Sequence, residues 1–333
     1  MSRSVTIDDV ARAAGVSRQT VSNVVNSPQI VREATRERVQ DAIRRLGYAP
    51  HASARRLRTR RSSTIGVHLN PYTGGISGVV LDRFVHALTE RAGERGLRVM
   101  LYAARTPDEE IRRMADLSDG GDIDAVVLTD TFPGDPRAEW LIERGLPFVS
   151  FGRPWGADDL GAPAHHWVDV DGAAGTAQAT RHALQAAGPR VAFLGWPRGS
   201  ATGDDRERGW REAMGAVPGL VRLTSEEYVA NARDAVAAAL PQQSLDAIVC
   251  AGDSLAIGAH LAAVAAGRPS LPVIGFDNTP AAEALGLSSV EQLPEQVAAG
   301  TLDLLLGSGT SIVPRAAEPG RAHVLVTPRL VVR

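Results

Sequence analysis

Three side chains near the start of the chain could each make paired hydrogen bonds to a flat partner. Residues 17–26 read SRQTVSNVVN, a stretch in which Ser17 is a natural N-cap and valines recur at helical spacing. Arg18, Gln19 and Asn23 are then left on the outer face. The stretch therefore predicts a helix that presents either a solvated polar surface or a surface shaped to read a flat partner.

The chain offers little of the chemistry that an enzyme needs. Asp, His and Ser are plentiful, but none forms a nucleophile elbow, a metal cluster or a P-loop. His165 and His166 are adjacent, so they face different directions and lack the helical spacing of metal ligands. The glycines at 74–78 and 198–203 match no phosphate-binding spacing. We therefore expect no catalytic residue, no metal and no cofactor.

The charge distribution suggests a polyanionic partner. The formal net charge is only -2, but residues 1–62 hold 13 Arg against 5 Asp or Glu, a local charge of +8. The other 271 residues hold 23 Arg against 33 acidic residues, a local charge of -10. A small basic head on a large acidic body suggests that the head meets a polyanion, with a solvated basic tail as the alternative.

Length and composition narrow the class of protein further. A chain of 333 residues with 44% hydrophobic and 22% charged residues predicts two or three globular domains. The single cysteine, Cys250, excludes an intramolecular disulfide and fits a reducing compartment. The start, MSRSVTIDDV, has no apolar stretch typical of a signal peptide, and no run of about 18 apolar residues predicts a membrane span. We expect a cytoplasmic protein.

The basic head is expected to fold as three short helices. Gly15 separates the first two helices, and Gly47 ends the third. The expected helices cover residues 6–13, 17–25 and 32–46. A helix, a short turn with Gly and a second helix form the helix-turn-helix arrangement.

From residue 64 onward, apolar strands alternate with helices such as that expected over 79–96. This alternation predicts parallel sheets covered on both faces, in two α/β lobes. Any ligand is then expected between the lobes, at the carboxyl ends of the strands. The strand candidates cover residues 64–69, 97–102, 123–129, 147–151, 190–195, 245–250, 272–276 and 323–328.

These segments resemble a known family. VTIDDVARAAGVSRQTVSNVVN, followed by TRERVQDAIRRLGYAPHASARRL, closely resembles the DNA-binding headpiece and hinge of the lactose repressor (LacI/GalR-type) family of bacterial transcription regulators. The resemblance continues through IGVHLNP, FGRP, VDVDGAAGTAQATRHAL, RVAFLG, RERGW, AGDSLAIGA, VIGFDNTP and VTPRLVVR. It implies a helix-turn-helix headpiece at 1–47, a hinge helix or linker at 48–62, and a two-lobe, periplasmic-binding-protein-like core at 63–333 for effector binding and dimerisation.

The resemblance places the second helix in the major groove of DNA. Arg18 would then suit the O6 and N7 atoms of guanine, while Gln19 and Asn23 suit adenine. Shorter polar side chains are expected at phosphate oxygens, where they position the head without specifying sequence. These side chains are Ser17, Thr20, Ser22 and Asn26.

The hinge is expected to read DNA in a second way. Leu57 matches the leucine that wedges between base pairs in the family, and Ala54 matches the small residue that allows close approach. Arg55 is expected at phosphates or in solvent. Packing of Leu57 onto the core is the alternative.

The resemblance also implies an effector site between the lobes. Arg206 matches the arginine that forks onto ligand hydroxyls or a carboxylate, and Asp277 matches an acid that accepts from sugar hydroxyls. Asp253 is expected on the facing loop. Asn70 and Tyr72 follow the first strand, where the family's contacts from the first lobe begin.

Aromatic residues suggest the class of effector. Trp155, Trp167 and Trp196 are expected at or beside the carboxyl ends of strands or in the loops there. Indoles pair well with the apolar face of a pyranose ring, which favours a carbohydrate, with packing as the alternative for each. Arg153 is expected either to reach the ligand or to brace its loop, and Trp210 is expected to be structural.

Three positions depart from the family pattern. Arg32 stands where a capping residue is usual, so the third helix should start less stably, by about 1 kcal/mol. Gly152 stands where some members carry an acid, and Gly252 where others carry Asn. The polar pattern of the pocket therefore does not name the effector.

We therefore expect a sequence-specific repressor of a carbohydrate catabolic operon that binds a palindromic operator as a homodimer, with a tetramer left open. A sugar effector is expected to change the angle between the lobes and release the operator. Such a bacterial protein would lie on the nucleoid while bound to its operator. The alternatives are a sugar-binding protein of a transporter and a corepressor-type regulator with a non-sugar effector.

Overall fold

The computed structural model describes residues 5–48, 62–69, 78–156, 163–216, 219–307, 309, 312 and 323–333. The chain divides into two units, Met1–Ser62 and Ser63–Arg333, which we call the head and the core. Five of the expected site residues lie outside the described part of the chain. They are Ala54, Arg55, Leu57, Asn70 and Tyr72.

The head contains the three expected helices and one short 3-10 helix. The Thr6 and Asp9 side chains form a capping box at the first helix, and the Ser17 hydroxyl caps the second. Arg32 precedes the third helix and makes no side-chain capping bond, as its residue type predicts. The helices are α1 (Ile7–Ala14), α2 (Arg18–Asn26), η1 (Pro28–Ile30) and α3 (Glu33–Leu46).

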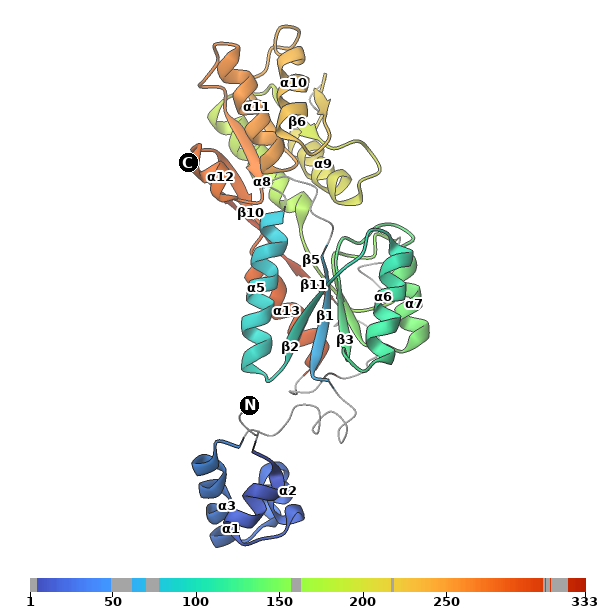
Figure 1. Cartoon of the computed structure of the whole chain (residues 1–333). Coiled ribbons are helices and arrows are strands. Elements are labelled where there is room, and N and C mark those ends of the chain that lie inside the picture. The colour runs from blue at the N-terminus through green and yellow to red at the C-terminus, as the bar shows by residue number, and fades with distance from the viewer. Residues whose placement is uncertain are drawn as a thin grey trace. The chain divides into compact units, whose positions relative to one another are not determined.

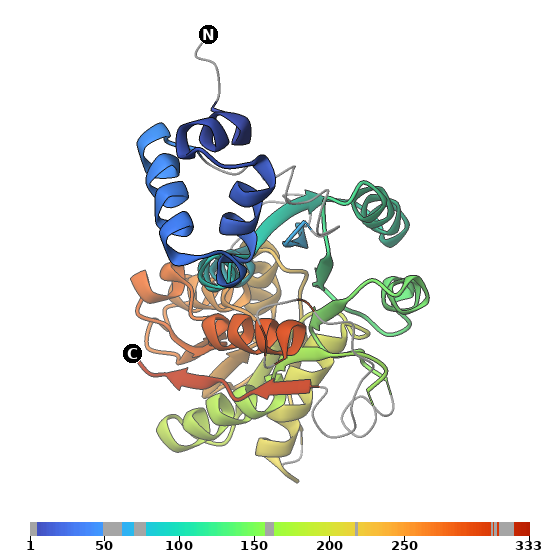
Figure 2. The same cartoon turned by 90° about the horizontal axis from the view of Figure 1, so that it is seen from below.

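A small apolar core holds these helices together. Val10, Val21 and Val39, one from each α-helix, have no exposed surface. Figures 1 and 2 show α1, α2 and α3 arranged around this common centre. Burying the valines fixes which face of α2 points outward, because the helical period places its polar residues opposite them.

Lobe 1 of the core is a six-stranded parallel sheet in the order β11-β5-β4-β3-β1-β2. Helices α5 (Gly78–Glu94) and α13 (Pro294–Leu306) cover one face, and α6 (Pro107–Asp119) and α7 (Pro136–Arg144) cover the other (Figure 1). The strands are β1 (Thr64–Leu69), β2 (Arg98–Ala103), β3 (Ala125–Leu128), β4 (Phe148–Phe151), β5 (Trp167–Val170) and β11 (His323–Val326).

Lobe 2 is a second six-stranded sheet in the order β12-β10-β9-β8-β6-β7, in which only β12 is antiparallel to its neighbour. Its strands are β6 (Val191–Gly195), β7 (Arg222–Thr224), β8 (Ala247–Cys250), β9 (Val273–Phe276), β10 (Ser288–Glu291) and β12 (Arg329–Val331). Its helices are α8 (Gly172–Ala186), α9 (Ala201–Met214), α10 (Val229–Ala239), α11 (Asp253–Ala265) and α12 (Pro280–Ala284).

The chain passes between the lobes three times in this topology. The passages join β5 to α8, β10 to α13 and β11 to β12. Each lobe is therefore assembled from segments that are far apart in the sequence. No helix in the described part of the chain is long and apolar enough to cross a membrane.

The eight expected strands are present, but four further strands were not expected from the sequence. Two of them, β7 and β12, have only three residues each and include exposed positions. Strands this short carry too few residues for an alternating or a continuous apolar pattern to emerge. The other two are β5 and β10.

Candidate functional site

The outer face of α2 carries the three side chains predicted to read bases. The Arg18 side chain is 72% exposed, and its Nε lies 4.0 Å from Asp8 Oδ1. Gln19 is exposed, Asn23 is half-buried, and Gln19 Nε2 donates to Asn23 Oδ1 at 3.0 Å. The structure therefore brings Gln19 and Asn23 together beside Arg18, opposite the buried valines.

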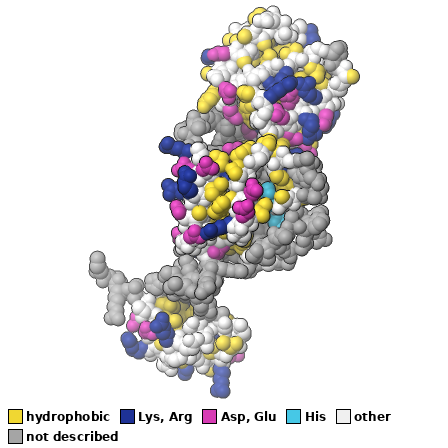
Figure 3. Space-filling view, turned by 90° about the vertical axis from the view of Figure 1, so that its right-hand side faces the viewer, with side chains coloured by type: hydrophobic (Ala, Val, Ile, Leu, Met, Phe, Trp, Pro, Cys, Tyr) yellow, Lys and Arg dark blue, Asp and Glu magenta, His cyan; other side chains and the backbone are white. Residues whose placement is uncertain are grey.

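The start of α2 carries short polar groups. Ser17 Oγ accepts from Thr20 N at 3.1 Å and shares a hydrogen bond with Thr20 Oγ1 at 2.9 Å. Ser22 is half-buried, and Asn26 is the last residue of the helix. Helix N-termini attract phosphate, because free N–H groups and the helix dipole favour negative charge there. Figure 3 shows Arg side chains at several places on the visible side of the head.

On the lobe 1 side of the predicted effector site, Arg153 is buried and bonded. Its Nε donates to Asp169 Oδ2 at 2.6 Å, and its Nη1 lies 3.8 Å from Asp205 Oδ1 in lobe 2. The Trp155 ring centroid is 4.9 Å from Arg153 Cζ. Burial raises the pKa of Asp169, opposed by Arg153. Arg153 therefore both braces its own lobe and links it to the other lobe.

On the lobe 2 side, Arg206 lies between aromatic rings. Its Cζ is 3.8 Å from the Phe276 ring centroid and 5.4 Å from that of Trp196. Its Nη1 donates to the Ala251 carbonyl and lies 3.8 Å from Asp277 Oδ1. The guanidinium is thus held in a fixed plane, which favours recognition of a ligand with paired oxygens.

Asp277 follows the last residue of β9 and is buried. Burial raises its pKa to about 8, opposed by Arg206 and reinforced by the nearby acids Asp253 and Glu227. Gln292 Nε2 donates to Asp277 Oδ1 at 2.5 Å. The raised pKa favours the protonated form of this carboxyl group, which can donate as well as accept a hydrogen bond.

Three buried N–H groups at this site have no hydrogen-bond partner among the described residues. They are Nε1 of Trp155, Nε1 of Trp196 and Nε of Arg206. A buried donor without an acceptor costs free energy, so such groups call for an explanation in a native structure. A hydroxyl-rich ligand offers the acceptors that these donors lack.

The sequence did not single out Glu227, which joins this site from the loop before α10. A Cβ atom placed on Gly252 would lie 3.4 Å from Glu227 Oε1, 3.5 Å from Trp196 Cζ2 and 3.7 Å from Asp277 Oδ2. Ser254 Oγ donates to the same Glu227 oxygen at 3.0 Å. Gly252, where other family members carry Asn, therefore leaves room at the point where these three side chains meet.

Two residues considered for the effector site are fully buried. Asp253 has no exposed surface, and both its carboxylate oxygens are bonded inside lobe 2. Trp167 is also fully buried and stacks on His323, with ring centroids 4.5 Å apart, so packing is its role. Trp210 is structural as expected, since its Nε1 donates to the Val191 carbonyl at 3.1 Å.

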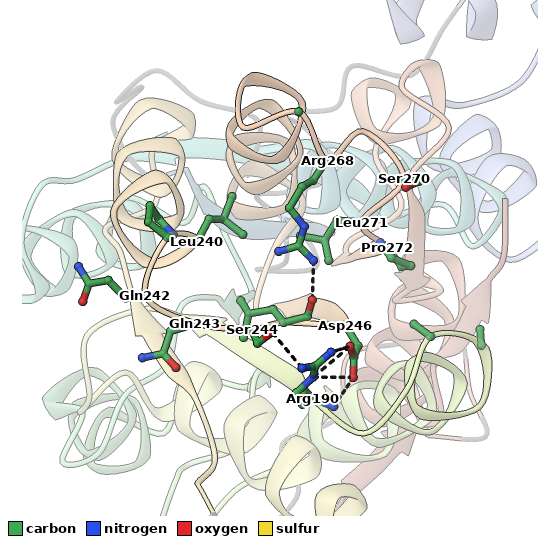
Figure 4. Close-up of a pocket in the computed structure, with 15 residues that line it drawn as sticks. Arg190, Leu240, Gln242, Gln243, Ser244, Asp246, Arg268, Ser270, Leu271 and Pro272 are labelled. Carbon is green, nitrogen blue, oxygen red and sulfur yellow. Dashed lines mark hydrogen bonds and ion pairs between the residues drawn. The ribbon is translucent and has the colours of Figure 1, made fainter.

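A hollow of about 780 Å³ lies at the other end of lobe 2, where β6, β8 and β9 begin (Figure 4). Arg190 pairs there with Asp246 at 2.5 Å, and Arg268 donates to the Leu245 carbonyl at 2.6 Å. Helices α8, α10 and α11 end beside it, where cationic side chains are stabilising. The fold therefore accounts for both arginines, and none of the predicted effector residues lines this hollow.

Comparisons with known proteins agree with this geometry. Residues 6–51 match the family model of bacterial regulatory proteins, lacI family, and residues 80–303 match that of periplasmic binding proteins and the sugar binding domain of the LacI family. The chain is 32% identical to the HTH-type transcriptional regulator CelR of Thermobifida fusca, over 97% of this chain and 98% of that protein.

Solved structures are similar over nearly the full length. A transcriptional regulator CelR-cellobiose complex is 27% identical, covers 99% of both chains and has a TM-score of 0.66. The lac repressor dimer bound to operator and the anti-inducer ONPF shares the fold at 22% identity and a TM-score of 0.79, over 99% of this chain and 98% of that chain. This chain belongs to the lacI family of bacterial regulatory proteins and is a helix-turn-helix transcriptional regulator.

Proposed function

We propose that this regulator represses a carbohydrate catabolic operon and leaves its operator when a sugar binds between its lobes. The observation that carries the proposal is the set of buried N–H donors of Trp155, Trp196 and Arg206 that have no partner among the described residues. Arg206 also lies 3.8 Å from the Asp277 carboxyl group. Hydroxyl groups complement these donors, and indole faces suit a sugar ring. The similarity to a regulator solved with cellobiose makes that disaccharide the first candidate to test.

The head is proposed to read the operator with the outer face of α2. Arg18 is assigned to guanine and Gln19 and Asn23 to adenine, because these side chains match the donor and acceptor pattern of those base edges. A single head reads few bases, so two chains are expected on a palindromic site. The phosphate contacts are assigned to Ser17, Thr20, Ser22 and Asn26, and the hinge contacts to Ala54, Arg55 and Leu57.

Two ion-pair links between the lobes are proposed to carry the signal. One is Arg153 with Asp205, and the other joins Arg83 of α5 to Glu291 at the end of β10, with Nη1 to Oε1 at 3.0 Å. A ligand that changes the angle between the lobes must rearrange both links. Coupling of about 1–3 kcal/mol between sugar and DNA sites is typical and is reciprocal.

The experiment uses the full-length protein and a palindromic operator obtained by selection from random DNA. Operator affinity is measured by fluorescence anisotropy at fixed salt, with and without millimolar cellobiose, maltose, raffinose or glucose. Release by one of these sugars supports the proposal. Tighter operator binding with sugar would contradict induction and favour the corepressor alternative, and no response to any carbohydrate would contradict the sugar effector.

A further inference from the structure

The buried carboxylate of Asp253 is bonded to the turn that follows β9. Asp253 is the first residue of α11, and its Oδ2 accepts from Thr279 N at 2.7 Å. Its Oδ1 accepts from Ser289 Oγ on β10 at 2.6 Å. The Ser289 hydroxyl in turn accepts from Asn278 N at 2.9 Å. One carboxylate and one hydroxyl therefore bind two consecutive backbone N–H groups of residues 277–279.

This turn has a backbone conformation that ordinary residues avoid. Asp277 has φ +114° and Asn278 has φ +50°, and neither residue is glycine. Left-handed backbone at residues with a Cβ atom costs free energy and persists only where the surroundings hold it in place. The hydrogen bonds that Ser289 accepts from Asn278 N and Asp253 accepts from Thr279 N hold the turn in this conformation.

The neighbouring strand is shaped to admit the carboxylate. A Cβ atom on Gly275 would lie 2.0 Å from Asp253 Oδ1, a distance that real structures do not allow. Only glycine at position 275 therefore leaves space for Asp253 in its present place. Strand β9, strand β10 and the start of α11 thus converge on one buried carboxylate.

We propose that Asp253 is a positioning residue of the effector site: with Ser289 it holds the 277–279 turn, and the turn places the Asp277 carboxyl group within 3.8 Å of Arg206 Nη1. Asp253 acts through Asp277 and touches no ligand, because it has no exposed surface. This inference rests on the proposed function, since its consequence is an effect on sugar affinity.

The test compares wild type with Asp253→Asn, which keeps the side-chain shape but cannot accept both bonds, and with the milder Ser289→Ala. Thr180→Ala is the matched control, because among the described residues its buried hydroxyl bonds only Thr176 O within α8. In the ligand-free full-length proteins, hydrogen exchange read by mass spectrometry should accelerate about tenfold over peptides spanning residues 277–279 in the two test variants and not in the control.

The second measurement is calorimetry with cellobiose, alongside operator affinity without sugar. Cellobiose Kd should rise about tenfold for Asp253→Asn and less for Ser289→Ala, while operator affinity stays within about twofold of wild type. Unchanged exchange at 277–279, unchanged cellobiose Kd, or an equal loss in Thr180→Ala would overturn the inference. If wild type bound no sugar, the proposed function would fail, while the exchange measurement would still decide whether Asp253 holds the turn.

Discussion

The proposed reading face of the head, on the outer side of α2, and the proposed effector site of the core achieve recognition in opposite ways. On α2, Arg18 and Gln19 are exposed, and their bonds to Asp8 and Asn23 are of the surface kind that water can replace. In the core, Arg206 and Asp277 are buried and fixed by neighbours from several elements. A flat, exposed face can exchange water for bases, whereas a buried site must be preorganised around its ligand.

The largest effect is expected from a variant that unfolds the head and leaves the core folded. Val21→Asp puts a charge into the small apolar core of the head, so we expect the head to unfold and operator binding to be lost. Sugar affinity, measured by calorimetry, should remain, because the core is a separate unit. Gln40→Asp on the exposed side of α3 is the control, and retained operator binding by the Val21 variant would contradict this picture of the head.

Removing the central cation of the effector site should have the next largest effect. Arg206→Ala takes away the only charged donor beside Asp277 among the contacts described above, so sugar affinity should fall about 100-fold. Operator binding should persist and no longer respond to sugar, as read by anisotropy. The control is Arg211→Ala, on the same helix but paired with Glu207, which should behave as wild type. If operator binding by the Arg206 variant still responded to sugar, Arg206 would not be part of the effector site.

Arg18→Ala tests whether Arg18 contacts a base or a phosphate of the operator. We expect a loss of discrimination of about 1–3 kcal/mol at one operator position, with other positions read as before. The measurement is operator affinity across a set of single-base variants. Equal weakening on every sequence would show that Arg18 is a phosphate anchor, and Arg12→Ala on the exposed side of α1 provides the comparison.

The buried acid Asp277 should make the stability of the core depend on pH. The pKa of Asp277 is raised to about 8, so the folded protein holds this proton more tightly than the unfolded chain. Its stabilising effect is full below about pH 4 and is lost as pH rises to about 8. Asp277→Asn should therefore lose less melting temperature between pH 5 and pH 8.5 than wild type, and an identical slope would argue against the raised pKa.

The smallest expected change is an increase in the stability of the head. Arg32→Ser supplies the capping oxygen that α3 lacks, and it should stabilise the helix start by about 1 kcal/mol. Slower hydrogen exchange at the first turn of α3 in the full-length protein would show it. Exchange as fast as in wild type would mean that another group already satisfies that helix end.

The polar outer side of α2 could be predicted from the sequence because it depends on local contacts. Helical spacing and the Ser17 cap place Arg18, Gln19 and Asn23 on one side of α2, and no distant residue is needed. Asp253 and Asp277 are both carboxylic acids, and the sequence predicts both at the effector site. Only the fold separates them, because Ser289, 36 residues from Asp253, turns one into an internal brace.

Other features of the site depended equally on distant segments. Glu227 follows β7, and it lies near Trp196 and Asp277 only because β7, β6, β8 and β9 are consecutive strands of the lobe 2 sheet. Trp167 belongs to a strand of an aromatic-poor chain, which made it a candidate to stack on a sugar ring. In the structure, His323 of β11, far along the chain, covers it instead. Such contacts have no signature in a single sequence, since nothing local specifies the partner.

The three passages between the lobes also bear on how the chain is made. The head is encoded entirely by early residues, so it can fold while the ribosome is still at work. Neither lobe can be finished then, because β11 and β12, one edge strand of each sheet, are translated only with residues 323–331. A nascent chain of this regulator can therefore complete its DNA-binding part well before the part that senses its effector.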